Sequence, residues 1–142
     1  MSLDDCFKRH QLRKTAPDIK KAEHSVVMAE LKIQKAKSLL DEGFFDMSLV
    51  NAYMAMFHLG RALLFKDGVI EKSHYCLVEY LRQEYSKKNL LPLEIVTMLD
   101  AFREQRHDIF YGLEEVTVEE KTCILAIENA GRFLKIVEDL LK

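Results

Sequence analysis

The sequence contains few of the residues that break a chain into turns. It has five glycines, two prolines and no tryptophan among 142 residues. An all-β protein needs many turns, so this shortage argues against one. The long segments between the glycines and prolines carry apolar residues at spacings of three and four, which is typical of amphipathic helices. We therefore predict an all-α protein.

The sequence also contains few cysteines and has no large excess of either charge. The three cysteines, Cys6, Cys76 and Cys123, are odd in number and far apart, which predicts a reducing compartment and no disulfide framework. With 21 basic and 23 acidic side chains the net charge is -2, which excludes a globally basic nucleic-acid binder but not a local basic patch. No apolar run is long enough for a membrane span, and the first residues hold no apolar leader. We expect a cytoplasmic protein with no membrane association.

Five helices account for most of the chain, whose length is that of a single domain, 1–142. The connections between them are short, which favours an antiparallel up-down helical bundle. The 47–67 helix is apolar nearly all round and is therefore either central or covered by a second subunit; Asp46 is its predicted N-cap. Thr117 and Glu120 form a capping-box pattern before the last helix. The predicted helices span residues 18–42, 47–67, 74–88 and 92–112, and a last one reaches the C-terminus.

Residues 1–16 differ in character from the rest of the chain. From Lys8 to Lys21 six side chains are Lys or Arg, and only Asp18 is acidic. We predict a basic N-terminal arm that is solvated and frayed, and a nucleic-acid contact is the alternative.

One residue of the 92–112 helix does not fit its core stripe. Arg106 falls on a position where steps of three and four residues call for an apolar side chain. A guanidinium cannot lose its proton, so burial there requires an acid, carbonyls, water or a ligand. Arg103, His107 and Tyr111 share the adjacent face. Two guanidiniums, an imidazole and a phenol are suited to binding anionic oxygens and moving a proton near neutral pH.

A structural interpretation accounts for the same residues. Arg103 would pair with Asp100 or Glu104, Arg106 with an acid of a neighbouring helix, and His107 would be exposed. The sequence contains no glycine-rich phosphate loop, nucleophile elbow or HExxH motif, and we predict no cofactor. His74 and Cys76 lie two residues apart without partners at zinc-ligand spacing, and we predict no metal site.

Three segments carry a family resemblance over about residues 22–140. They read AKSLLDEGFFDMSLVNAYMAMFHLGRALLFKDG, KSHYCLVEYL and FREQRHDIFYGL. Together they resemble the HEPN domains of archaea and bacteria. The resemblance implies an antiparallel helical bundle, usually a homodimer, that is associated with a small nucleotidyltransferase, often in a toxin–antitoxin pair. It also implies that active members are metal-independent RNases, in which the 2′-hydroxyl of RNA attacks the adjacent phosphate.

The RNase motif of that family is an Arg followed, after four to six residues, by a His, and the two copies meet across the dimer cleft. This sequence departs from it. Only three residues separate Arg103 from His107, and Arg106 is directly followed by His107. Tyr111 stands about where the histidine would be. With an ordinary pKa of about 10, tyrosine is a poor general base at pH 7.

Three hypotheses follow for the function. The first, which we prefer because the catalytic motif is imperfect, is a partner of a small nucleotidyltransferase that holds nucleotide or RNA phosphate through Arg103 and Arg106. The resemblance suggests that Asn51 and Tyr53 approach the same cleft.

The second hypothesis is a metal-independent RNase toxin that uses Arg106, His107 and Tyr111 at a dimer cleft. The third is a structural homodimer without a ligand, in which Arg106 closes an internal ion pair. In each case we expect a homodimer through the 47–67 helix and the 95–111 face.

Overall fold

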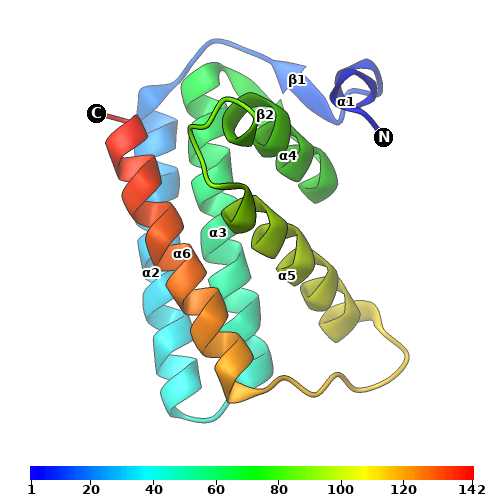
Figure 1. Cartoon of the computed structure of the whole chain (residues 1–142), viewed down its shortest axis with the longest axis vertical. Helices are drawn as coiled ribbons and strands as arrows, with labels where there is room; N and C mark the ends of the chain where they lie inside the picture. Colours follow the sequence, from blue (N-terminus) through cyan, green and yellow to red (C-terminus); the bar gives the residue numbers. More distant parts are fainter.

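The computed structural model describes all 142 residues as an up-down bundle of helices (Figure 1). In chain order the elements are α1 (Leu3–Lys8), β1 (Leu12–Lys14), α2 (Ile19–Asp41), α3 (Phe45–Asp67), β2 (Val69–Glu71), α4 (His74–Leu81), the π-helical turn η1 (Arg82–Ser86), α5 (Leu93–Tyr111) and α6 (Glu120–Leu140). The predicted all-α fold is confirmed, and α2 to α6 match the five predicted helices. None of the helices combines the length and the apolar character that a membrane crossing requires.

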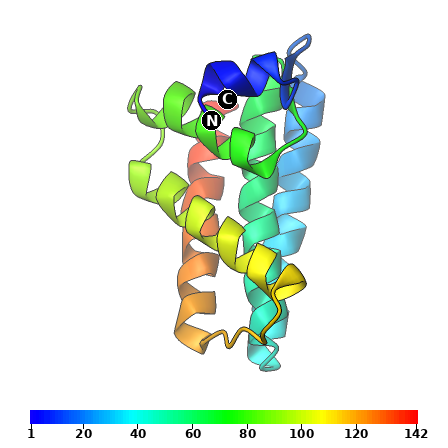
Figure 2. The same ribbon diagram turned by 90° about the vertical axis from the view of Figure 1, so that its right-hand side faces the viewer.

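Helix α3 is the centre of the bundle. It packs against α2, α4, α5 and α6, with α2 and α6 on one side and α4 and α5 on the other (Figures 1 and 2). Its side chains are buried on every face, as at Leu49, Val50 and Ala52. The apolar surface of this helix is thus explained within one chain and does not call for a second subunit. A homodimer remains a prediction.

Helix α4 approaches α3 closely at Gly60. A Cβ on Gly60 would lie 2.8 Å from Cδ2 of Leu77, so a larger residue would force the Leu77 side chain to shift. The start of α4 is fixed by Ser73, whose hydroxyl accepts a hydrogen bond from the Cys76 amide at 3.2 Å. As a result His74, the first residue of α4, is held against α3.

The N-terminal segment is ordered, and the prediction of a frayed arm is wrong. Strand β1 pairs antiparallel with β2, with Leu12 opposite Glu71 and Lys14 opposite Val69. Helix α1 lies across α4 (Figure 2). Cys6 and Leu12 are buried. The charge count of this segment overlooked these two apolar side chains, whose burial ties it to the bundle while its basic residues remain outside.

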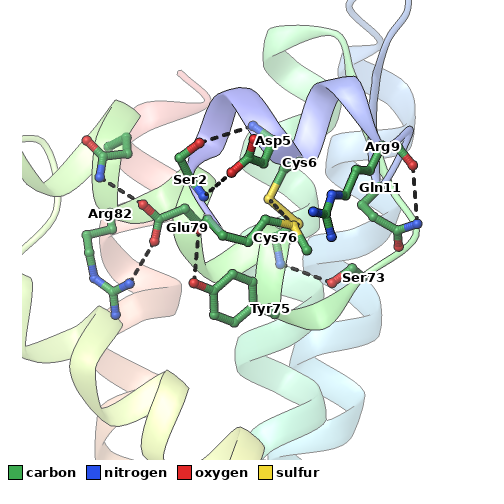
Figure 3. Close-up of a disulfide and its surroundings, with 12 residues drawn as sticks. Ser2, Asp5, Cys6, Arg9, Gln11, Ser73, Tyr75, Cys76, Glu79 and Arg82 are labelled. Atoms are coloured by element: carbon green, nitrogen blue, oxygen red, sulfur yellow. Dashed lines mark hydrogen bonds and ion pairs between the residues drawn. A yellow bond between two sulfur atoms is a disulfide. The ribbon is translucent and has the colours of Figure 1, made fainter.

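Cys6 of α1 and Cys76 of α4 form a disulfide (Figure 3), so the prediction of no disulfide is wrong. Their separation of 70 residues gave no indication of it, because the fold alone brings the two Cα atoms to 5.8 Å. The expectation of a reducing compartment rested on the absence of a disulfide, so the structure no longer supports it. The Tyr75 hydroxyl adds a second link between the two segments by donating to the Met1 carbonyl at 3.0 Å. Cys123 is free and buried.

Two predicted helix caps are also wrong. Helix α3 begins at Phe45, two residues earlier than expected, which places Asp46 inside its first turn, where its carboxylate accepts from the Met47 amide at 2.8 Å. Helix α6 begins after Glu119 without a side-chain cap, so Thr117 and Glu120 do not form a capping box. An acid in the first turn of each helix interacts favourably with the helix dipole without serving as the cap.

The disulfide predicts a stability that depends on the redox state. Reduction should lower the free energy of unfolding by about 2–4 kcal/mol, because a long loop in the unfolded chain is no longer closed. The melting temperature should fall by roughly 5–15 °C, measured by circular dichroism with and without reductant. Cys6→Ser should match the reduced wild type and be insensitive to reductant, whereas Cys123→Ala should keep the sensitivity. An unchanged wild-type melting temperature in reductant would contradict the disulfide.

Candidate functional site

Arg106 lies at the rim of the bundle, where α5 leaves the core. Phe102, one turn earlier, is 5% exposed, whereas Leu113, just beyond the end of α5, is fully exposed. Phe102 is thus the last fully buried residue of α5, Ile109 still packs partly buried against the core, and Arg106 lies half-buried between them. This position gives the guanidinium both a protein wall and access to solvent.

The guanidinium of Arg106 has aromatic neighbours and no acid. Its Cζ lies 5.9 Å from the centre of the Tyr53 ring and 5.6 Å from that of Phe110. No carboxylate forms an ion pair with it, so the internal ion pair of the structural interpretation is wrong. Its Nε is buried and has no hydrogen-bond partner. The charge of Arg106 is thus not compensated by any acid of the chain, which leaves its guanidinium available to an anion.

Arg103, in contrast, follows the structural interpretation. Its Nε lies 2.8 Å from a carboxylate oxygen of Asp100, and its Nη2 lies 3.7 Å from Glu104. Its guanidinium also covers the Tyr75 ring at 5.7 Å. The charge of Arg103 is therefore largely compensated, and that of Arg106 is not.

His107 and Tyr111 are exposed on the outer side of α5. Their ring centres lie 5.0 Å apart, and Tyr111 is 67% exposed. A shallow pocket beside them is lined by Arg103, Glu104, His107 and Asp108. The two acids of this pocket oppose the binding of an anion there. The structure thus brings His107 and Tyr111 together on the outer side of α5, whereas Arg106 lies over Tyr53 of α3.

Tyr53 and His74 form the inner wall of the site. The Tyr53 hydroxyl lies 2.6 Å from Nδ1 of His74, whose ring stacks on Phe57 at 4.1 Å. Burial raises the pKa of Tyr53, although Arg106 and Arg103 oppose the shift. Burial, with Arg106 and Arg103, lowers the pKa of His74 to about 4. At neutral pH a neutral phenol and a neutral imidazole therefore share this hydrogen bond.

Asn51 does not join this group. Its amide donates to the Met47 carbonyl at 2.8 Å within α3. Two residues along a helix turn a side chain by about 200°, so Asn51 and Tyr53 point to opposite sides of α3. Of the two residues suggested on this helix, only Tyr53 lies beside Arg106. We call Tyr53, His74, Arg103 and Arg106 the Arg106 site.

Sequence reasoning missed His74, which it considered only as a zinc ligand. The serine before it was a readable sign that His74 opens a helix. Its pairing with Tyr53, which is 21 residues away, has no signal in the sequence because it depends on the close packing of α4 on α3.

Comparison with known proteins places the chain in a family. The model of the HEPN domain matches residues 22–140. The chain belongs to the HEPN family. It is 30% identical over 113 residues to a UPF0332 protein of Gloeobacter violaceus. The aligned region covers 80% of this chain and 90% of that protein. The matched part of this HEPN domain holds the whole Arg106 site, whereas α1 and β1, and with them Cys6, lie outside it.

The environment of His74 predicts a pH-dependent stability. Its pKa is about 4 in the folded HEPN domain, below the ordinary histidine value of 6.5. Above about pH 6.5 the His74 imidazole is neutral in both the folded and the unfolded chain, so it adds no pH dependence to the free energy of unfolding. As the pH falls from about 6.5 towards 4, the unfolded chain takes up a proton that the folded chain does not, so the free energy of unfolding decreases.

Urea unfolding at several pH values checks this effect. Wild type should lose more stability between pH 7 and pH 5 than His74→Asn, which has no imidazole to titrate. The other histidines are present in both proteins and serve as the internal control. Equal losses in the two proteins would mean that His74 titrates as it does in the unfolded chain.

Proposed function

We propose that this HEPN protein binds the phosphate groups of RNA or of a nucleotide at the Arg106 site, and that it acts as the partner of a small nucleotidyltransferase in a toxin–antitoxin-like pair. Membership of the HEPN family supports the second part. The geometry of the site supports the first.

The observation that carries the proposal is the unpaired guanidinium of Arg106. Its neighbour Arg103 has two acids, whereas Arg106 has none, although both are on the same helix. The planar guanidinium forms two parallel hydrogen bonds to a phosphate, which a lysine could not match. The Nη atoms, which have no hydrogen-bond partner in the protein and are not enclosed, offer these donors.

Exposed aromatic rings beside Arg106 favour a nucleic acid over a simple anion. Phe110 and Tyr111 are both exposed at the end of α5. Bases stack on such rings with little dependence on sequence, and each stack contributes about 1–3 kcal/mol. A phosphate on Arg106 and a base on a neighbouring ring would fit a single nucleotide unit of RNA.

The test is the binding of a fluorescent single-stranded RNA, followed by anisotropy at several salt concentrations. Arg106→Met keeps the apolar stem over Tyr53 and Phe110 and removes the charge. It should weaken binding about tenfold or more, as the loss of a charged hydrogen bond does. The slope of log affinity against log salt should also become shallower by about 1.

Arg132→Ala is the matched control, since it removes the same charge from α6, where Arg132 pairs with Glu94. Glu94 lies twelve residues before Arg106 on α5, about 18 Å along the helix axis. This variant should bind like wild type. Equal losses in the two variants would show general attraction to charge, and no binding by wild type would refute the proposal.

The second candidate function is a metal-independent RNase using Arg106, His107 and Tyr111. It is favoured by the exposed imidazole of His107, which lies 5.0 Å from the ring of Tyr111 and directly follows Arg106. Incubation of labelled RNA with wild type in EDTA tests it. Cleavage that is lost in both Arg106→Met and His107→Ala would establish the enzyme, and intact RNA would leave a binding module.

The partner is tested separately. The tagged chain, expressed in its own host, should co-purify with a small nucleotidyltransferase identified by mass spectrometry. Arg106→Met serves as the comparison, because it distinguishes a partner held at the Arg106 site from one held elsewhere. Analytical ultracentrifugation of the purified chain tests the expected homodimer.

A further inference from the structure

His74 stands in the Arg106 site with one ring nitrogen engaged and the other free. Nδ1 is 2.6 Å from the Tyr53 hydroxyl. Tyr53 is fully buried, so its phenol must donate to a protein acceptor, and Nδ1 is the acceptor within reach. An imidazole that accepts at Nδ1 carries its proton on Nε2. Nε2 has no hydrogen-bond partner in the protein and is not enclosed.

One positive charge near the His74 ring has no carboxylate to balance it. Three guanidiniums act on His74, those of Arg61, Arg103 and Arg106. Arg61 is paired with Glu71 at 2.6 Å, and Arg103 is paired with Asp100 at 2.8 Å. Only Arg106 lacks a counter-charge. His74 is also the first residue of α4, where the helix dipole adds a positive potential.

We propose that His74 is a phosphate-binding residue of this HEPN domain: it donates its Nε2–H to the same phosphate that Arg106 holds, and Tyr53 positions the ring for that role. This inference rests on the proposed function and names a residue outside the Arg-to-His spacing of the family motif. The ligand class is a phosphodiester, as in single-stranded RNA. No covalent step is involved.

The role of Tyr53 follows from the geometry. The ring of His74 is clamped between the stacked Phe57 and the Tyr53 hydroxyl. If that hydroxyl is removed, Nδ1 loses its donor and both neutral tautomers become available. In the tautomer with a proton on Nδ1, Nε2 is an acceptor and repels a phosphate oxygen. Tyr53 is therefore a positioning residue.

A bound phosphate should change the titration of His74. The groups that face the ring are Tyr53 and Arg61 from α3, and Arg103 and Arg106 from α5. All of the charged ones are cations, so the free site disfavours a protonated ring. The nearby carboxylates of Glu71 and Asp100 are already paired with Arg61 and Arg103, so a phosphodiester would bring the first unpaired negative charge and favour the protonated form. RNA binding should then tighten as the pH falls below about 6 towards the pKa of about 4 of His74 in the free site, and this effect should depend on His74.

The first measurement needs no ligand. Long-range nitrogen–proton NMR of the free, uniformly labelled protein distinguishes the two neutral tautomers of each histidine. We expect His74 to be neutral at pH 7 with its proton on Nε2, and Tyr53→Phe to give a mixture of tautomers. A proton on Nδ1 in the wild type would overturn the inference, whatever the outcome for RNA binding.

The second measurement uses a pair of substitutions that separate the two ring nitrogens. In His74→Asn the side-chain oxygen can still accept from Tyr53, but no donor remains at the Nε2 position. His74→Gln places a donor near Nε2 and loses the acceptor. We expect RNA affinity to fall about tenfold in His74→Asn and by a smaller factor in His74→Gln. Thermal melts confirm that both variants are folded.

The outcomes separate this inference from the proposed function. If wild type binds RNA, Arg106→Met loses binding and His74→Asn binds like wild type, then the inference fails and the proposed function stands. If wild type binds no RNA, both fail. A loss in His74→Asn with an unchanged Arg132→Ala, together with a weaker pH dependence, supports both.

Discussion

The hydrogen bond between the buried hydroxyl of Tyr53 and His74 is the interaction on which the candidate site depends. Tyr53 lies on the central helix, where no water can solvate its phenol, so an unpaired hydroxyl would cost about 1–3 kcal/mol. The partner that meets this need is a side chain at the start of α4. That requirement fixes where α4 begins relative to α3, and it fixes the orientation of the imidazole. Arg106 then covers the same tyrosine ring from α5.

Several features of the fold serve to hold α4 in this place. Gly60 leaves room for the Leu77 side chain of α4 against α3, and Ser73, two residues after β2, caps the helix. On its outer side α4 is tied to α1 by the Cys6–Cys76 disulfide and by the bond from Tyr75 to the Met1 carbonyl (Figure 3). The N-terminal segment thus stabilises the element that carries His74, although it contributes no residue to the site itself.

The sequence predicted the helices well because each has an apolar face with a regular period, and that period depends only on local geometry. It also identified Arg106, because a charged residue inside an apolar stripe is visible without a structure. It could not identify His74, the ordered N-terminal segment or the disulfide. Each of these depends on contacts between residues far apart in the chain, and the spacing of Cys6 and Cys76 carries no information about their distance in the fold. Asn51 was misplaced for a simpler reason, since a separation of two residues on a helix points side chains to opposite sides.

The positions of the acids on α5 explain why two neighbouring arginines differ. Asp100 and Glu104 lie three residues before and one residue after Arg103, and both reach its guanidinium. Arg106 is six residues beyond Asp100, which places it about 240° further round the helix, away from that acid and towards Tyr53. Arg106 is only half-buried there, so the side chain can lie on the aromatic ring while its outer nitrogens remain open to solvent. Arg103 is thus held by its own helix, whereas the charge of Arg106 is free for a ligand.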